Sequence, residues 1–492
     1  MRLRLSEDAE AGIAVKSDWA WLGSVTAFLI LVFLLGGSSD GQPTIVFLLR
    51  ILSIALIAAA LYRLRDSNLG PSIIYVIIGS GIGLLLLHLV PLPPLIWKSL
   101  PGREFVVAAV DASGATPKWM PLSLAQTLTH LSFLALLPPL AAFAATLTLP
   151  PRQRWVLVIA ILIFVVANII FGLLQRFQGP ESAFYIYEKT NLGTATGTFA
   201  NSNYLAALLY IAIPLSWALA LRALRERLMR YHVIIGLAVI MVLLFVLGLA
   251  VAGSRAGVLL GMVSLLGSSF LTWGQGKRIA VTRYMRFAVP MLIGTLLILG
   301  QFGMVVILQL GETDPLTDLR GQIYWTTLHA AWKYFPVGSG FGTFVPIYAM
   351  QETPSTMLDE FVNHAHNDWL ELWLEGGLPA ALILAAFVWW FIGSSIRIWR
   401  ADMRHGATLL PRAATLAMGL LLLHSLVDFP LRAPAIACIF GIFVAVVASA
   451  PVSARIRFRS HEEPIRRDPV PAPKPAWRAA QFLAPKNARP FS

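Results

Sequence analysis

The sequence has few charged residues and almost no cysteine, and each scarcity excludes a class of protein. Only 13% of its 492 residues are charged and 57% are hydrophobic, whereas a soluble chain carries about 25% charged residues. The single cysteine, Cys438, excludes an intramolecular disulfide and a metal site built on cysteines. Glycine motifs of the P-loop and dinucleotide-binding types do not occur, so ATP and nucleotide sugars are not expected as substrates.

Long apolar runs recur along the whole chain. The runs are continuous and do not alternate, so they predict membrane helices and not the strands of a barrel. We therefore expect an all-α polytopic membrane protein with about twelve transmembrane helices. The predicted spans are residues 20–36, 44–62, 72–96, 123–149, 155–175, 204–221, 233–253, 257–273, 288–310, 374–396, 413–428 and 432–450.

Lysine and arginine predict how these spans are oriented. With the N-terminus inside, five short inner loops hold sixteen of them, and the much longer outer segments hold nine. Positive charge favours the cytoplasmic side, so both termini are expected there. The N-terminal stretch lacks the cleavage site of a signal peptide. The net charge of +13 then reflects topology and contact with anionic membrane lipids, and no nucleic-acid partner is expected.

Five regions follow from this pattern. Residues 1–19 form a cytoplasmic tail, and residues 20–310 hold transmembrane helices 1–9. Residues 311–373 form one large outer loop, which we expect to be catalytic because long ordered loops commonly carry function. Residues 374–450 hold helices 10–12, and the basic, proline-rich residues 451–492 are expected to be a disordered cytoplasmic tail.

Arginines at the outer face are the first candidates for a binding site. Arg255 lies between two apolar runs, and Arg320 lies in the large outer loop. Arg176 and Arg432 are weaker candidates of the same kind. Two guanidinium groups can hold a diphosphate through paired hydrogen bonds. The competing interpretations are a snorkelling side chain for Arg255 and an ion pair with a nearby aspartate for Arg320.

The densest polar cluster is the segment Asn-His-Ala-His-Asn-Asp-Trp-Leu-Glu at residues 363–371. His364, His366 and Asp368 have the spacing of part of a metal site, although Trp369 stands where a further histidine ligand would complete it. The histidines also fit hydrogen-bonding residues at the membrane surface. A third interpretation is a general base, because imidazole can take a proton from an acceptor hydroxyl near neutral pH.

Two neighbouring groups have simpler interpretations. Gly338, Gly340 and Gly342 allow close approach of a ligand to the backbone or a mobile lid, but turn formation is the favoured interpretation. Glu371 and Glu375 are expected to be solvated or paired with arginine and not catalytic.

The stretch HAHNDWLELWLEGGLPA resembles the signature of the O-antigen ligase and polymerase superfamily of bacterial membrane glycosyltransferases. The match begins at His366 and Asn367 and reaches Gly377, and it departs from the family pattern at Ala380. Further segments similar to the same family are GTFANSNYLAALLYIAIPL (197–215), SRAG (254–257), the arginine-bearing segment 318–344 and HSLVDFPLRAPA (424–435).

The resemblance implies a bacterial inner-membrane enzyme whose donor is a polyprenyl-diphosphate-linked glycan. An acceptor hydroxyl would attack with inversion at the periplasmic face, with neither a metal nor a cofactor. Carried over by motif, the resemblance implies that His366 is the catalytic base or orients the acceptor, and that Arg255 and Arg320 hold the diphosphate. Further substrate contacts are expected from Arg176, Asn201, Asn203, His364, Asn367 and Arg432, with helix capping as the alternative for Asn201 and Asn203.

Several functions remain open. An O-antigen ligase would use lipid A-core as acceptor, and a polymerase would join repeat units of O-antigen or exopolysaccharide. Transfer onto a protein hydroxyl would use the same pattern. A flippase or transporter of lipid-linked glycan would place ionisable residues in the middle of several spans, and Arg50 is the one clear example. A non-catalytic membrane scaffold would not need so long and polar an outer loop.

Overall fold

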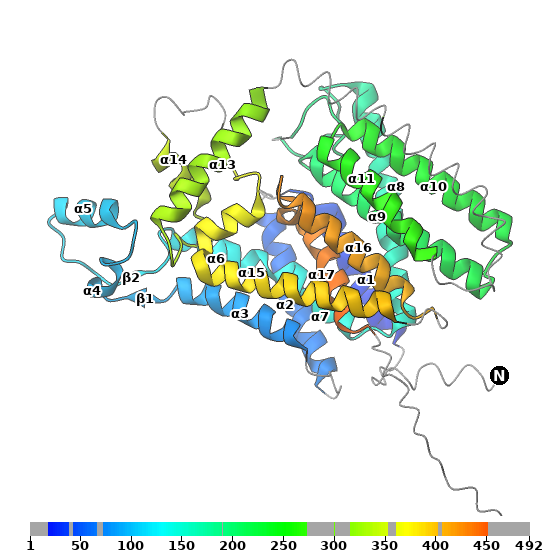
Figure 1. Cartoon of the computed structure of the whole chain (residues 1–492), viewed down its shortest axis with the longest axis horizontal. Helices are drawn as coiled ribbons and strands as arrows, with labels where there is room; N and C mark the ends of the chain where they lie inside the picture. Colours follow the sequence, from blue (N-terminus) through cyan, green and yellow to red (C-terminus); the bar gives the residue numbers. More distant parts are fainter. Residues whose placement is uncertain are drawn as a thin grey trace, which may run out of the picture. The chain divides into compact units, whose positions relative to one another are not determined.

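The computed structural model is helical, with one short sheet, in the part of the chain that it describes (Figure 1). The chain divides into two compact units, residues 1–452 and 453–492, and the second lies outside the described residues. Three predicted segments also lie outside the described residues, wholly or for the most part: the N-terminal tail, the C-terminal tail and the span at 288–310. The described residues are 18–38, 43–65, 72–188, 190–272, 300, 315–352, 361–401 and 406–450.

The elements follow one another along the chain as helices and one hairpin. The α-helices are α1 (Trp19–Leu35), α2 (Pro43–Leu64), α3 (Ile73–His88), α4 (Pro94–Trp97), α5 (Glu104–Ala112), α6 (Gln126–Ala135), α7 (Leu137–Leu147), α8 (Pro151–Gln178), α9 (Ser202–Glu226), α10 (Tyr231–Ala252), α11 (Arg255–Ser269), α13 (Pro315–Lys333), α14 (Phe344–Gln351), α15 (Asp368–Arg400), α16 (Leu409–His424) and α17 (Pro434–Ala448). Short 3-10 helices are η2 (Phe270–Thr272) and η3 (Pro430–Arg432), and β1 (Pro91–Leu92) pairs antiparallel with β2 (Met120–Pro121).

Within the described residues, seven helical segments are long and apolar enough to cross a membrane. Four further apolar helices, α1, α3, α16 and α17, are shorter. Every predicted span that falls on described residues overlaps one of these helices. The prediction of a helical multi-pass membrane protein is confirmed, while the count of twelve spans and the orientation stay predictions.

Two predicted boundaries differ from the structure. The third span was expected to reach residue 96, but α3 ends at His88. Closely spaced prolines follow, which cannot continue a helix and instead begin the hairpin. The tenth span was expected to begin at residue 374, but α15 begins at Asp368. Its start is fixed by Asn367, whose Oδ1 accepts hydrogen bonds from the amides of Trp369 and Leu370 at 3.1 and 3.0 Å.

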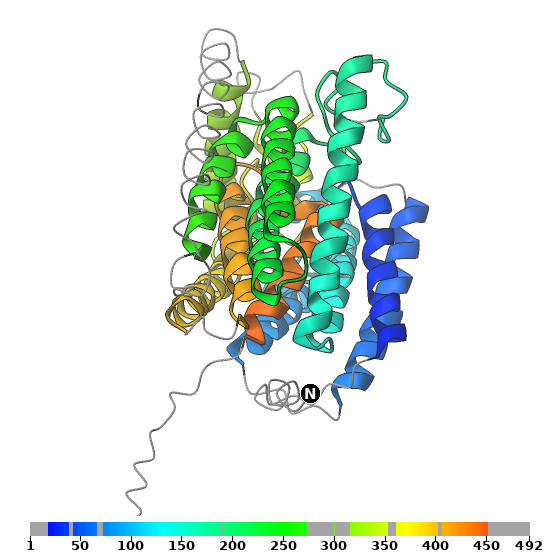
Figure 2. The same cartoon turned by 90° about the vertical axis from the view of Figure 1, so that its right-hand side faces the viewer.

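Helix α9 lies at the centre of the bundle. Its residues from Tyr204 to Leu215 are all buried, because α9 is apolar on every side and packs against α8, α10, α11 and α16. Figure 1 shows this group side by side, and Figure 2 shows α1 and α2 beside α8. The N-terminal end of α9 is thereby held in a fixed place, and the site described below is built around it.

Helices α7 and α17 pack closely through small residues. A Cβ atom added to Gly441 would lie 2.5 Å from the carbonyl oxygen of Pro139, so the two backbones approach too closely for a larger side chain. Buried alanines such as Ala141 and Ala445 line the same contact. Small residues that allow backbones to approach are typical of helix packing within a bilayer.

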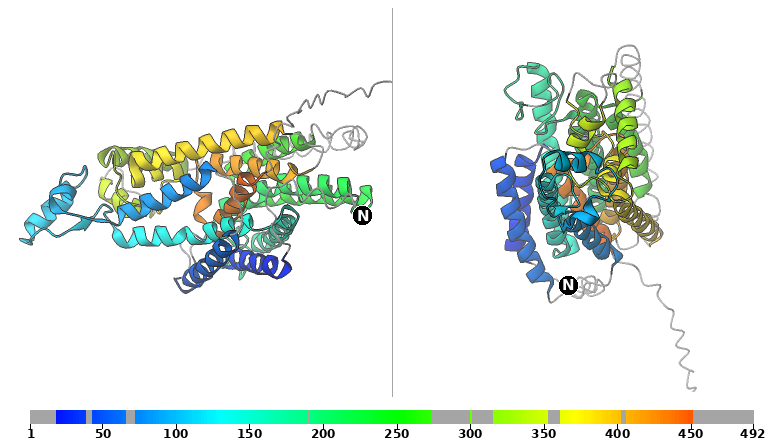
Figure 3. Two further views of the ribbon diagram at one scale, coloured as in Figure 1. Left: turned by 90° about the horizontal axis from the view of Figure 1, so that it is seen from below. Right: turned by 90° about the vertical axis from the view of Figure 1, so that its left-hand side faces the viewer.

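A glycine turn joins α13 to α14 and packs against a kink in α15, the helix that runs beside α3 in Figure 3. Gly377 has a φ of +60°, which breaks the helical geometry of α15. The freed amide of Leu378 donates to the carbonyl of Pro336 at 2.8 Å, and the amide of Gly340 donates to the carbonyl of Glu375 at 2.9 Å. A Cβ at Gly338 would collide with that same carbonyl. The predicted role of these glycines in a turn is confirmed.

We predict that Gly377→Ala lowers the thermal stability of the detergent-solubilised protein. A side chain at φ +60° and ψ −152° costs about 1–3 kcal/mol, and the added Cβ would also collide with the carbonyl of Pro336. The matched control is Gly393→Ala in the same helix, where no atom lies within 4 Å of the added Cβ. Melting followed by tryptophan fluorescence should show a clear loss for the first variant and none for the second. Equal melting temperatures would contradict the assigned role of the kink.

Candidate functional site

The loop between α8 and α9 is tied down by two buried amide side chains of α8. Gln175 accepts from the amide of Gly197 at 2.8 Å and donates to the carbonyl of the same residue at 2.8 Å. Asn168 accepts from the amide and the hydroxyl of Thr198 at 2.8 and 2.9 Å. This anchoring delivers the chain to Asn201, which caps α9 by accepting from the amide of Asn203 at 2.8 Å. The motif at residues 197–203 therefore sets the start of α9.

His366 stands on the segment that leads into α15, in an unusual backbone conformation. Its φ is +50°, a region that side-chain-bearing residues seldom occupy. The hydroxyl of Tyr324 on α13 donates to its carbonyl at 2.9 Å, and its ring packs against Phe429 with centroids 5.0 Å apart. Its Nδ1 lies 3.3 Å from Oδ1 of Asp428, and its side chain is 26% exposed. Backbone strain of this kind is concentrated at functional sites.

The carboxylate of Asp428 is buried and surrounded by groups from other segments. Besides His366, the side-chain amide of Asn203 donates to its Oδ2. Nε2 of His424 lies 4.0 Å from that oxygen. Donors meet both of its oxygens, and hydrogen bonds to a carboxylate favour its charged form. Asp428 is therefore ionised at neutral pH.

An ionised carboxylate can only accept hydrogen bonds, and this fixes the protonation pattern of His366. Nδ1 of the neutral ring must carry the proton that it shares with Asp428. The lone pair then belongs to Nε2, on a side chain that is partly exposed. The same arrangement of carboxylate and imidazole orients the base in nucleophilic catalysis by serine enzymes. The site can therefore accept a proton at Nε2 of His366.

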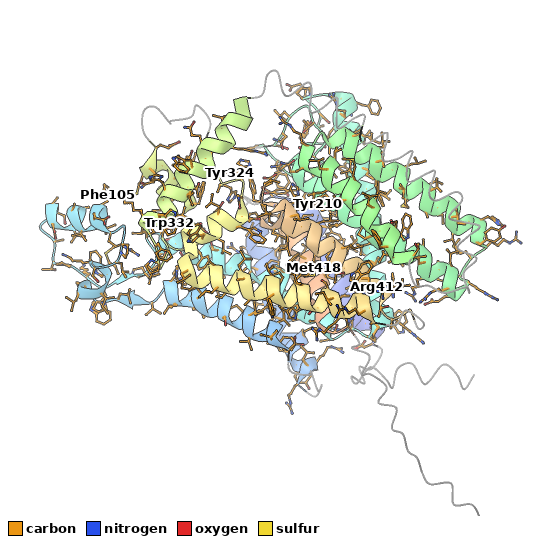
Figure 4. The ribbon with its side chains drawn as sticks, in the orientation of Figure 1. Phe105, Tyr210, Tyr324, Trp332, Arg412 and Met418 are labelled. Carbon is orange, nitrogen blue, oxygen red and sulfur yellow. The ribbon has the colours of Figure 1, made fainter. Side chains whose placement is uncertain are left out.

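A buried polar pair continues from Asp428 into the bundle. Nδ1 of His424 lies 3.0 Å from the hydroxyl of Tyr210 on α9, and both side chains are fully buried. Figure 4 shows Tyr210 beside α16 and Tyr324 on α13 above it. If the tyrosine hydroxyl donates to Nδ1, the proton of His424 lies on Nε2, which faces the carboxylate. That N–H then faces Asp428 from 4.0 Å, beyond hydrogen-bonding distance, so His366 is the histidine that hydrogen-bonds the carboxylate.

A second network fixes the segment that carries His366. Glu371 is buried, and its Oε2 accepts from the amide of Ala365 at 2.9 Å. Its Oε1 lies 3.0 Å from Nδ1 of His364 and 3.0 Å from Nη2 of Arg432. Arg432 also pairs with Asp368 at 3.2 Å, and the amide of Asp368 donates to the carbonyl of Ser425 at 2.9 Å. The network therefore joins the segment at 364–371 to the segment at 425–432.

The four outer arginines predicted from the sequence lie in different surroundings. Arg320 stands on α13 one turn before Tyr324, whose hydroxyl contacts the carbonyl of His366. Arg255 begins α11, which packs so closely on α9 that a Cβ at Gly257 would collide with Ala206. Arg176 is exposed and donates to the carbonyl of Gly193 at 3.2 Å. Arg432 is held by the acidic pair described above.

The remaining predicted residues take mainly structural positions. Asn201 and Asn367 are helix caps, and His364 is held by Glu371. Asn203 does not cap α9 and instead contacts Asp428. The structure thus brings Asn203 and His366 together at Asp428, and it places Arg320 one helical turn before Tyr324, which contacts His366.

Two glutamates differ from the sequence-based expectation of solvated side chains. Glu371 is paired with Arg432, which agrees with the predicted pairing with arginine, but its side chain is buried. Glu375 is also buried, and its Oε1 accepts from the amide of Phe344 at 3.1 Å, which caps α14. The low hydropathy of glutamate misleads here because its charge is compensated by partners that are remote in sequence.

A shared metal site is not favoured by this geometry. The two imidazoles of His364 and His366 bond to different carboxylates, those of Glu371 and Asp428. Among the residues that the structure describes, no group of three or more His, Cys, Asp or Glu side chains could hold a metal ion.

Sequence reasoning missed three residues of the site, Asp428, His424 and Tyr324. His424 and Asp428 lie in segment 424–435 and Tyr324 lies in segment 318–344, and the sequence singles out these three residues only through the family resemblance of those segments. A signal was present, because His424 and Asp428 stand four residues apart beside an outer turn. The pairing of Asp428 with His366 spans 62 positions, and no local pattern reveals it.

Comparison with known families agrees with the segments singled out above. Residues 190–385 match the family model described as O-antigen ligase. The match includes Asn203, Arg255, Arg320 and His366, and it ends before Asp428. No curated protein sequence matches the chain significantly.

We predict that Glu371→Gln destabilises the protein by about 3 kcal/mol, because Arg432 loses its fully buried anionic partner and keeps only Asp368, while His364 loses its carboxylate partner. Thermal melting in detergent is the measurement. Glu226→Gln is the matched control, since Glu226 forms an exposed pair with Arg222 at 2.8 Å, worth about 0.5 kcal/mol or less. A loss at Glu371 no greater than at Glu226 would refute the proposed bracing role.

Proposed function

Because the chain carries a domain of the O-antigen ligase superfamily, a group of membrane glycosyltransferases of ligase or polymerase type, we propose that it transfers a polyprenyl-diphosphate-linked glycan onto an acceptor hydroxyl. The reaction is assigned to the periplasmic face of the bacterial inner membrane. The observation that carries this proposal is the pair of His366 and Asp428, in which the carboxylate leaves Nε2 of the imidazole as the base.

The proposed step is a single displacement at the anomeric carbon. The acceptor oxygen forms the new bond to this carbon as its proton passes to Nε2 of His366. The bond from the carbon to the diphosphate breaks, and the diphosphate leaves with the electron pair. One displacement inverts the configuration, and the step needs neither a metal nor a cofactor.

The leaving diphosphate needs charge stabilisation more than protonation. Arg320 stands on α13 one turn before Tyr324, and Arg255 starts a helix that packs beside the first turns of α9. We assign both arginines to the diphosphate. Guanidinium keeps its charge at an apolar boundary and offers paired donors to phosphate oxygens. The contact of Asn203 with Asp428 makes it a positioning residue for the base.

The acceptor assigned first is lipid A-core, as in an O-antigen ligase. The alternative is a second lipid-linked glycan, as in a polymerase of O-antigen or exopolysaccharide repeats. An alternative of another class is a flippase or transporter of the same lipid. A flippase has no use for an oriented base, and for this reason the enzyme is the preferred proposal.

We predict that His366→Ala lowers the rate of glycan transfer about 100-fold or more, the usual contribution of a general base. Asp428→Asn should lower it by at least about tenfold, because the amide can no longer fix the tautomer of the ring. His232→Ala, an exposed histidine at the start of α10, is the control and should transfer normally. Wild-type rates in folded His366→Ala protein would remove His366 from the mechanism.

We predict that Arg320→Lys raises the KM for the lipid-linked donor about tenfold, because lysine keeps the charge but loses the paired hydrogen bonds to phosphate. The exposed Arg230 at the cap of α10 provides the control Arg230→Lys. Initial rates in proteoliposomes at varied donor give the two constants. An unchanged KM for Arg320→Lys would contradict its assignment to the diphosphate.

The reaction itself is tested with purified protein, the polyprenyl-diphosphate-linked glycan and EDTA, with lipid A-core offered in one sample and donor alone in another. Product on lipid A-core identifies a ligase, and longer lipid-linked chains identify a polymerase. Movement of the glycan across the bilayer without any covalent product would overturn the proposal in favour of a flippase.

A further inference from the structure

Helix α13 has two faces that differ in their surroundings. One face carries Tyr324 toward His366 and buries Ile323 and Ala330 in a small core with α14 and α15. The other face is exposed and carries aromatic rings: Trp325 is 65% exposed, and Trp332 is 57% exposed. These aromatic positions are one helical stripe and not isolated residues.

The stripe is continuous along the helix. The rings of Trp325 and exposed His329 lie 5.6 Å apart, and Trp332 follows one turn later. Trp332 in turn contacts Trp373 of α15, with ring centroids 5.0 Å apart. Between Gly321 and Trp332 the sequence has no charged residue. A helix whose outer face met only water would ordinarily carry charges there.

The stripe leads directly onto the apolar surface of a membrane span. Pro336, one turn beyond Trp332, accepts a hydrogen bond from the amide of Leu378. From Leu378 the exposed side of α15 continues through Leu382 and Trp389, which are 61% and 79% exposed. Because α15 is a candidate span, these side chains face lipid. The aromatic stripe of α13 therefore continues a surface that the membrane already covers.

The direction of α13 fits the same surface. Figure 1 shows α13 running across the direction of α15 and α16, which it would not do as another span. A transverse helix at the end of a span lies along the membrane surface. Indole rings favour this region, since they combine a large apolar face with one hydrogen-bond donor.

We infer that the exposed stripe of α13 (Trp325, His329 and Trp332) is seated in the headgroup region of the outer leaflet. The occupant of the surface is thus membrane lipid. Resting on the proposed function, the inference has a consequence for the site, because Arg320 and Tyr324 are on the same helix. The lipid surface then sets the depth of Arg320 at the level where the diphosphate of a membrane-bound donor lies.

The seat of the stripe is tested by fluorescent labelling at single cysteines. The only cysteine, Cys438, is buried, so Cys438→Ala gives the background for Trp325→Cys and His329→Cys labelled with an environment-sensitive dye. Leu382→Cys is the lipid-facing control, and Glu181→Cys, at an exposed acidic residue after α8, is the aqueous control. We expect blue-shifted emission, with quenching by nitroxide near the lipid headgroup and protection from iodide, at positions 325 and 329. Emission and iodide quenching like those at position 181 would overturn the inference.

Activity provides an independent readout. In proteoliposomes Trp325→Ala should raise the KM for the lipid-linked donor and leave kcat unchanged, while Trp325→Phe should retain most of the wild-type KM. A water-exposed label together with weaker binding of a soluble glycan by Trp325→Ala would make the stripe a sugar platform instead, against the inference. The labelling result does not depend on catalysis, so an inactive wild-type enzyme would sink the proposed function alone.

Discussion

A carboxylate removed from water must be met by hydrogen-bond donors or positive charge, and Asp428 is met by groups from several separate segments. His366 comes from the segment before α15, Asn203 from the start of α9, and His424 from the end of α16. Each of these groups is held in place by the need to compensate the same charge. The position of the His366 side chain is therefore a consequence of compensating one buried acid.

The second buried acid, Glu371, has a different task. Its partners His364, Ala365 and Arg432 belong to the two segments that carry His366 and Asp428. Asp428 thus orients the imidazole of His366, and Glu371 holds the backbone beside it. The network of Glu371 contacts the backbone beside His366 and not its ring. Its loss would therefore loosen the strained backbone of His366 and leave the contact between the ring and Asp428 in place.

The bundle beneath the site supplies the rigidity that these networks need. Helix α9 is buried along most of its length, so its first turn cannot shift without moving its neighbours. The kink at Gly377 and the turn at 336–342 anchor the outer helices to α15 by backbone hydrogen bonds. The aromatic stripe on α13 adds lipid as a further support for the same elements.

The sequence by itself determined the helical membrane class, the approximate places of the spans and the family, because apolar runs and short motifs are local properties. It also offered helix capping as one of two interpretations of Asn201, and it indicated that the glycines at 338–342 would form a turn. Only the tertiary structure decided that Asp428 pairs with His366, and that Glu371 and Glu375 are buried. This pairing and this burial depend on which side chains compensate each buried charge. Those partners come from segments far apart in the chain, and only the packing of the helices brings them together.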